Sequence, residues 1–149
     1  MRTHGHWPPL ERAMKTYAHA GEHGKLWLGL CSAGALLDER RRPLYLRGLR
    51  SVAISYGINQ AIKFTVRRAR PSLPDLPPLT RTITALSYPS AHTTTAFACA
   101  RSLSRCLPAG GLYAAAGLMA FSRPYLGVHY PSDVLAGAAL GTAVAELVR

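Results

Sequence analysis

The chain has 149 residues, a formal net charge of +11 and a pI of about 10.3. A chain of this length is normally one domain, so we expect residues 1–149 to fold as a single unit. The positive balance predicts an anionic partner such as a phosphate group or an acidic lipid. Nucleic acid is not indicated, because no nucleic-acid-binding motif is present and the basic residues are not interleaved with aromatic ones.

Residues 1–25 are polar and rich in histidine, and they lack the basic start and apolar run of a cleaved signal peptide. Leu10, Met14 and Tyr17 recur at helical spacing with charged residues between them. This pattern predicts an N-terminal amphipathic helix that lies on a membrane surface. The histidines lack metal-ligand spacing, so we expect them to be solvated side chains.

Five apolar runs follow, at residues 26–37, 44–62, 92–107, 112–121 and 134–148. None is an uncharged stretch of about 20 residues, which alone would identify a transmembrane helix. Arginines near helix ends can snorkel to the interface and lengthen the usable span. The runs therefore predict an all-α fold, a transmembrane helical bundle of about five spans plus the N-terminal amphipathic helix. A soluble all-α bundle is the alternative.

Small residues are frequent in the last two runs. Gly137 and Gly141 form a small-xxx-small pattern, which lets two helices approach closely in lipid. In a soluble bundle the same residues would lie at helix contacts.

Residues 122–133, SRPYLGVHYPSD, join the last two runs. If a helix begins at Pro131, where proline is favoured, Asp133 falls one turn after His129. The carboxylate can then bind one imidazole nitrogen and leave the other free to attack. Arg123 offers a planar fork of donors suited to a phosphate. A loop with a capping aspartate and a surface arginine explains each residue singly.

Two other stretches carry related residue types, namely residues 63–71, KFTVRRARP, and residues 88–92, YPSAH. In chain order the three stretches read K-x6-RP, P-S-A-H and SR-x5-H-x3-D. This set resembles the type 2 phosphatidic acid phosphatase (PAP2) family, whose superfamily also contains bacterial acid phosphatases and vanadium haloperoxidases. The resemblance covers about half the chain and implies a PAP2/haloperoxidase-like core. One position departs: Ala91 stands where the family usually has glycine, and its methyl group could crowd a phosphate.

The positions of the motifs can also be predicted without the resemblance, by counting how often the chain crosses the membrane. If each run crosses once, the turns at 38–43 and 108–111 lie on one side of the bundle. All three motifs then lie together on the other side, although they are far apart in sequence.

The motif residues suit phosphate-ester hydrolysis, which needs charge neutralisation, an in-line nucleophile and an acid. His129, held by Asp133, is the candidate nucleophile, and His92 is the candidate acid for the leaving oxygen. The expected phosphate-binding residues are Lys63, Arg70, Ser90, Ala91 and Arg123. The resemblance implies a phosphohistidine intermediate that water later hydrolyses, with no metal and no cofactor. The sequence also lacks the clustered carboxylates of a Mg²⁺ site.

Simpler explanations exist for several residues. Lys63 and Arg70 could be interfacial anchors, the role we expect for Arg67 and Arg68. His92 could be an ordinary helix-start residue, and Ser90 could only cap the helix that follows. Arg81 lies between motifs and could touch a headgroup. Residues 21–24 lie on the motif side and could contact substrate, although a polar helix start explains them as well.

The predicted function is that of a metal-independent membrane phosphatase acting on a polyprenyl or glycerolipid phosphate or diphosphate. Decaprenylphosphoryl-5-phosphoribose is one candidate substrate, by analogy with high-GC bacteria; undecaprenyl diphosphate and phosphatidylglycerophosphate are others. Two further classes stay open: a soluble acid phosphatase or haloperoxidase, and a catalytically silent membrane protein that binds anionic lipid.

The expected location is the bacterial plasma membrane. The Arg40–Arg42 cluster favours a cytoplasmic 38–43 loop and an extracytoplasmic active site. The sequence predicts no oligomeric state.

Overall fold

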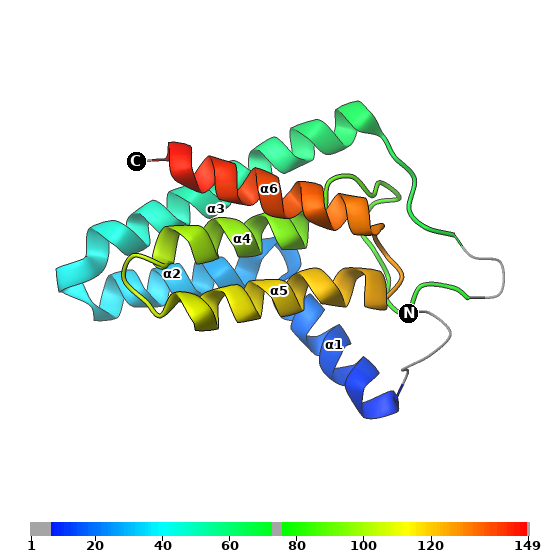
Figure 1. Ribbon diagram of the computed structural model, residues 1–149, viewed down its shortest axis with the longest axis horizontal. Coiled ribbons are helices and arrows are strands. Elements are labelled where there is room, and N and C mark those ends of the chain that lie inside the picture. The colour runs from blue at the N-terminus through cyan, green and yellow to red at the C-terminus, as the bar shows by residue number, and fades with distance from the viewer. Residues whose placement is uncertain (1–6, 73–75, 149) are drawn as a thin grey trace.

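The computed structural model describes residues 7–72 and 76–148, and these form an all-helical bundle (Figure 1). The elements are α1 (Pro8–Ala20), η1 (Glu22–Gly24), α2 (Lys25–Leu37), η2 (Glu39–Arg41), α3 (Arg42–Val66), α4 (Ala91–Leu103), α5 (Ala109–Tyr125) and α6 (Pro131–Leu147), where η marks a 3₁₀ helix. In the described ranges the one β contact is an isolated antiparallel bridge between Ala69 and Leu86. The predicted fold class is therefore confirmed as all-α.

Helix boundaries follow local chemistry. α1, α3 and α6 each have proline in the first turn, where the missing N–H costs nothing. α3 ends at Val66, and the φ of 53° at the following Arg67 lies in the left-handed region typical of helix C-termini. α5 continues beyond the apolar run to Tyr125. Arg123 therefore lies in the last turn of a helix and is buried, so the simpler explanation of residues 122–133 as a loop with a surface arginine does not hold at this residue.

α4 lies in the middle of the bundle and packs against α2, α3, α5 and α6. Its core side chains are small, and Ala96, Cys99 and Ala100 are fully buried. Small side chains allow the surrounding helices to approach α4 closely, because helix separation depends on side-chain size at the contact.

α4 and α6 approach each other closely. A Cβ atom on Gly137 would lie 2.7 Å from the Ser90 carbonyl oxygen, and one on Gly141 would lie 2.1 Å from the Thr94 carbonyl oxygen. Only glycine fits at these distances. The predicted close contact at Gly137 and Gly141 is thus confirmed, and it fixes the start of α4 against α6.

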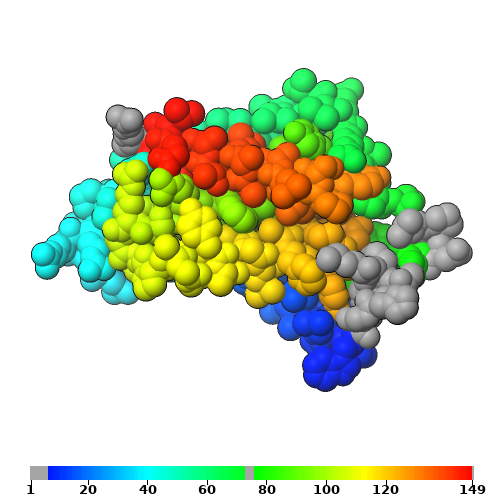
Figure 2. Space-filling view, viewed as in Figure 1, coloured from blue at the N-terminus to red at the C-terminus, as the bar shows by residue number. Residues whose placement is uncertain are grey.

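α1 projects from the bundle beneath α5 (Figures 1 and 2). Met14 and Ala18 are buried against Tyr125, Leu126 and Val128. The predicted amphipathic helix is therefore present, but its apolar face packs on the protein. The end of α5 and the following loop cover this face, and the location of the helix on a membrane surface stays a prediction.

The outer faces of the bundle carry large exposed apolar side chains, among them Leu30, Leu36, Leu37, Leu46, Ile54, Ile58, Phe64, Leu118, Phe121, Leu135 and Leu147. None of the helices in residues 7–72 and 76–148 combines the length and the apolar character of a membrane span. The five spans stay a prediction.

Four helix ends meet at one end of the bundle: the C-terminal ends of α3 and α5 and the N-terminal ends of α4 and α6 (Figure 1). The turn between α2 and α3 lies at the opposite end (Figure 1). The predicted placement of all three motifs at one end of the bundle is therefore confirmed.

Candidate active site

A cavity of about 100 Å³ opens at the end where the three motifs meet. Six predicted site residues line it: Lys63, Arg70, Ala91, His92, Arg123 and His129. Ser90 and Asp133 are fully buried just behind it. Within the described part of the chain, no three His, Cys, Asp or Glu side chains converge as a metal-binding group.

His129 lies in the segment between α5 and α6, and Asp133 lies in the first turn of α6. His129 Nδ1 is 3.6 Å from Asp133 Oδ2, and both side chains are buried. The same carboxylate oxygen accepts the Tyr130 backbone N–H at 2.9 Å, which completes a capping box at the helix start. The predicted one-turn relation is confirmed, and it aims Nδ1 at the carboxylate.

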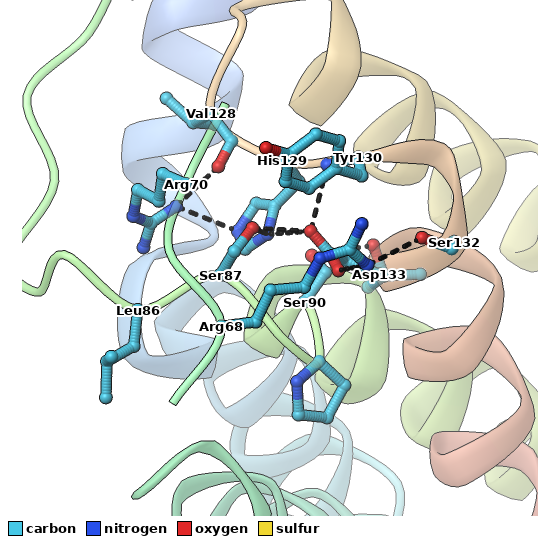
Figure 3. A network of polar contacts seen from close by, with 12 residues as sticks. Arg68, Arg70, Leu86, Ser87, Ser90, Val128, His129, Tyr130, Ser132 and Asp133 are labelled. Carbon is cyan, nitrogen blue, oxygen red and sulfur yellow. Dashed lines mark hydrogen bonds and ion pairs between the residues drawn. The ribbon is translucent and has the colours of Figure 1, made fainter. Parts of the chain in front are cut away.

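Ser87 was missed by the sequence prediction and lies between these two residues (Figure 3). Its hydroxyl donates a short hydrogen bond to Asp133 Oδ2, and its Oγ is 3.3 Å from His129 Nδ1. With the Nδ1–H tautomer, which we assign from this network, Oγ accepts from the ring. Ser87 thus links the imidazole to the carboxylate.

Arg68 approaches Asp133 from the far side of the carboxylate (Figure 3). Its Nη1 donates to Asp133 Oδ1 at 2.9 Å and to Ser132 Oγ at 2.8 Å, and the guanidinium stacks 4.1 Å from the Tyr130 ring centroid. The expectation that Arg68 is an interfacial anchor was wrong, because this arginine neutralises the buried carboxylate.

Arg70 reaches the other ring nitrogen of His129 (Figure 3). Its Nη1 is 3.2 Å from His129 Nε2 and donates to the Val128 carbonyl at 2.7 Å, while Nε donates to the Thr84 carbonyl at 2.8 Å. Burial lowers the pKa of Arg70 from its ordinary value. The guanidinium is therefore held by carbonyls beside the nitrogen that we expect to attack.

Lys63, near the end of α3, is almost fully buried. Its Nζ donates to the carbonyls of Pro89 at 3.0 Å, Leu86 at 3.3 Å and Ser87 at 3.4 Å. These bonds hold the segment that precedes α4 in place. The ammonium therefore both orders this segment and adds positive charge to the cavity.

Arg123, in the last turn of α5, is 4% exposed, and its Nε has no hydrogen-bond partner among the described residues. A buried charged group with an unpaired donor is costly unless a ligand of opposite charge binds it. This arginine is therefore a candidate anion-binding group in the cavity wall.

His92 is held by α1, since its Nε2 is 3.1 Å from the Ala18 carbonyl oxygen. Ser90 precedes α4 as its N-cap and donates its N–H to the Asp133 carbonyl at 3.0 Å. The Ser90 hydroxyl accepts from Thr93 Oγ1 at 3.0 Å. Of the P-S-A-H motif, the two residues that line the cavity are thus Ala91 and His92.

The environment of His129 favours its neutral form. Burial lowers the pKa of His129 to about 4, the charges of Arg123, Arg70 and Lys63 act in the same direction, and the hydrogen-bond partner Asp133 opposes them. An imidazole with this pKa is unprotonated near neutral pH, so Nε2 keeps a lone pair for attack on an electrophile.

Residues 44–149 match the family model of the PAP2 superfamily. The chain is 40% identical over 144 residues to a protein of Mycobacterium tuberculosis named decaprenylphosphoryl-5-phosphoribose phosphatase, covering 95% of this chain and 80% of the relative. The protein of the same name from Mycolicibacterium smegmatis is 38% identical over 132 residues, covering 87% and 72%.

Two solved structures share the fold. The transmembrane PAP2-type phosphatidylglycerolphosphate phosphatase of Bacillus subtilis superposes with a TM-score of 0.75 at 28% identity, covering 96% of this chain and 76% of its own. Aquifex aeolicus LpxE has the same TM-score at 21% identity, covering 97% and 87%, which supports the fold alone.

Proposed function

We propose that this chain, which belongs to the PAP2 superfamily and is one of its phosphatases, removes the terminal phosphate of decaprenylphosphoryl-5-phosphoribose. Two relatives from different species carry the name of this activity and match most of the chain. The proposal adds to family membership the identity of the lipid phosphate and the roles of the site residues.

The observation that carries the phosphatase chemistry is the partnerless Nε of buried Arg123 in a cavity that Lys63 and Arg70 also line. Three cationic side chains around one small cavity suit the oxygens of a phosphomonoester. Ala91 and the free N–H groups at the start of α4 would face the same anion.

In the first step His129 Nε2 attacks phosphorus, and the bond from phosphorus to the leaving alkoxide oxygen breaks. His92 gives this oxygen a proton, so the lipid-linked ribose leaves as an alcohol. The Ala18 carbonyl accepts a hydrogen bond from His92 Nε2, which leaves Nδ1 to exchange the proton. Asp133, through its contacts with Ser87 and His129, stabilises the charge that develops on the attacking ring.

In the second step water attacks the phosphohistidine and gives its proton to His92. The nitrogen–phosphorus bond breaks, phosphate leaves, and His129 is restored. Both steps use side chains that this chain supplies, so we propose that activity persists without a metal ion.

We further propose that the protein lies in the bacterial plasma membrane with its active site on the extracytoplasmic side. The exposed leucine, isoleucine and phenylalanine side chains on the outer helix faces suit contact with lipid. The B. subtilis structural neighbour is a transmembrane protein. A lipid-anchored phosphate could then reach the cavity from the bilayer.

Phosphatidylglycerophosphate is the second candidate substrate, because the B. subtilis neighbour is named for it and is 28% identical to this chain. The chemistry at His129 would be the same. The two candidates differ in the group that carries the phosphate.

A phosphate-release assay on purified full-length protein in detergent tests the proposal. We expect turnover of decaprenylphosphoryl-5-phosphoribose in excess EDTA, with a higher kcat/KM than for phosphatidylglycerophosphate or undecaprenyl diphosphate. Vanadate should inhibit it. His129→Ala should abolish release, and Arg40→Ala, an exposed arginine near the start of α3, should not. Preference for another lipid, or activity lost to EDTA and restored by Mg²⁺, would contradict the proposal.

A further inference from the structure

The cavity extends beyond the phosphate-binding residues to a second wall, which we call the η1–α3 rim. The rim consists of Glu22 and His23 from η1 and Tyr56 and Gln60 from α3, all of which line the cavity. η1 packs against α2, α3 and α4, so the rim has a fixed place beside the motif residues.

The backbone of the rim is strained at His23. Its φ of 53° and ψ of 20° lie in the left-handed region, which is unfavourable for a residue with a Cβ atom. The ring is fixed from α3, since His23 Nδ1 lies 2.7 Å from Tyr56 Oη and the two rings meet edge to face. Strain of this kind persists where neighbours over-determine a conformation, and it is common at ligand-binding sites.

The charge of the rim is opposite to that of the phosphate site. Among the described residues that line the cavity, Glu22 is the one acid, whereas Lys63, Arg70, Arg81 and Arg123 are basic. A carboxylate repels a phosphate but accepts hydrogen bonds from hydroxyl groups. Glu22 is 3.4 Å from the exposed His19 and is near enough to Arg123 for the two charges to interact, although Arg123 Nε has no hydrogen-bond partner among the described residues.

We propose that the η1–α3 rim is a subsite for vicinal hydroxyl groups on the part of the substrate that carries the scissile phosphate. Glu22 accepts hydrogen bonds from the hydroxyls, while the His23–Tyr56 pair and the Gln60 amide complete the wall. The subsite rests on the function proposed above and makes it more specific. It selects a phosphorylated sugar or polyol attached to lipid over an alkyl or diacylglycerol phosphate.

Two substrates that differ only in the hydroxyls test the subsite: a short-chain prenylphosphoryl-5-phosphoribose and its 2,3-dideoxy counterpart. The full-length wild type should prefer the hydroxylated compound by about tenfold in kcat/KM, the size expected for a hydrogen bond to a charged group. Glu22→Gln should reduce this preference to about twofold, because kcat/KM falls more for the hydroxylated compound than for its dideoxy counterpart.

His23→Gly provides a second variant that cannot lose activity through added strain. Glycine adopts a positive φ freely, so this change should maintain or raise the melting temperature while it weakens the hydroxyl preference. Lys25→Ala, at an exposed neighbouring position outside the cavity lining, is the matched control and should behave as wild type.

The outcomes separate the two proposals. If the wild type hydrolyses both compounds equally well, the subsite is wrong and the proposed function stands. If Glu22→Gln lowers both kcat/KM values together, the carboxylate acts on Arg123 and the subsite is also wrong. If the wild type hydrolyses neither compound but hydrolyses another lipid phosphate, the proposed function fails and the subsite fails with it.

Discussion

Asp133 receives hydrogen bonds from three directions, namely the Ser87 hydroxyl, the Tyr130 backbone N–H and the Arg68 guanidinium. A fully buried carboxylate needs this many donors to stay ionised. These bonds hold the carboxylate that orients His129 in place, and the Ser87 hydroxyl bridges this carboxylate and the imidazole ring. The geometry of the proposed nucleophile therefore depends on a serine outside the three motifs.

Replacing Ser87 with alanine should lower kcat by about tenfold or more with little change in KM. The reason is that a hydrogen bond to a charged group contributes about 1.5–3 kcal/mol and that this serine does not line the cavity. Phosphate release at saturating substrate measures the effect. Ser104→Ala, which removes a hydroxyl bonded to the Arg101 carbonyl after α4, is the control and should keep full activity. Equal kcat values for the two variants would show that Ser87 plays no positioning role.

The lowered pKa of His129 has a measurable consequence. The folded-state pKa is about 4, below the ordinary value of 6.5, so the ring stays neutral as the pH falls from 7 to 5 and gains a proton only near pH 4. Histidine NMR of labelled protein in detergent, with the His129 signal assigned through His129→Asn, follows this titration. A midpoint for His129 near 6.5 would contradict the burial seen here.

The three motifs predicted most of the residues that meet at the candidate site, because each motif specifies both the residue types and their spacing. Arg68 and Ser87 could not be found in that way. Their positions depend on the backbone pairing of residues 68–70 with residues 85–87, including the bridge between Ala69 and Leu86. That pairing joins two irregular stretches and leaves no periodic signal in the sequence.

Among the helices, the contact of α4 with α6 positions the site most directly. It holds Ser90, at the start of α4, against the helix whose first turn carries Asp133. Helix existence was predictable from the apolar runs and the prolines. The true end of α5 was not, because Arg123 and Pro124 continue the helix beyond its apolar part.

Gly141→Ala should destabilise the protein, since the new methyl group would meet the Thr94 carbonyl oxygen at 2.1 Å. Overpacking typically costs about 1–3 kcal/mol, which lowers the melting temperature by several degrees. Gly117→Ala is the matched control: a Cβ there meets nothing within 4 Å, and alanine favours the helix by up to about 1 kcal/mol. Thermal melting of both variants in detergent checks the pair. Equal or reversed shifts would contradict the close packing of α4 and α6.

For the molecule as a whole, the positions of the arginines bear on its orientation in a membrane. The elements at the end of the bundle away from the cavity are η2, the start of α3 and the end of α4 (Figure 1). They and the residues that follow α4 contain Arg40, Arg41, Arg42, Arg101 and Arg105. Arg41 forms an ion pair with Asp38 and Arg42 with Glu39, while Glu146 forms ion pairs with Arg101 and Arg105, so acidic side chains compensate part of the charge of both groups. The positive-inside rule counts Lys and Arg rather than net charge, and Arg40–Arg42 are three such residues in one short loop. This cluster supports the proposed cytoplasmic side.

Single cysteines at Arg41 and Ser72, both exposed positions, test the orientation in a background without Cys31, Cys99 and Cys106. A membrane-impermeant thiol reagent on intact cells should label position 72 and leave position 41 unlabelled until the cells are opened. Labelling of position 41 alone would reverse the orientation. Labelling of both from outside would mean that the two ends do not lie on opposite sides of a membrane.

The central claim is that His129 becomes phosphorylated, and rapid quenching of full-length enzyme with a ³²P-labelled lipid phosphate tests it most directly. Wild type should yield an acid-labile, base-stable phosphohistidine that mass spectrometry maps to His129. With a good leaving group, His92→Ala should accumulate the same species, because its formation then needs no acid while its hydrolysis has lost the base. His129→Ala should yield none. A phosphoenzyme that survives His129→Ala, or phosphate release by that variant at the wild-type rate, would contradict the account.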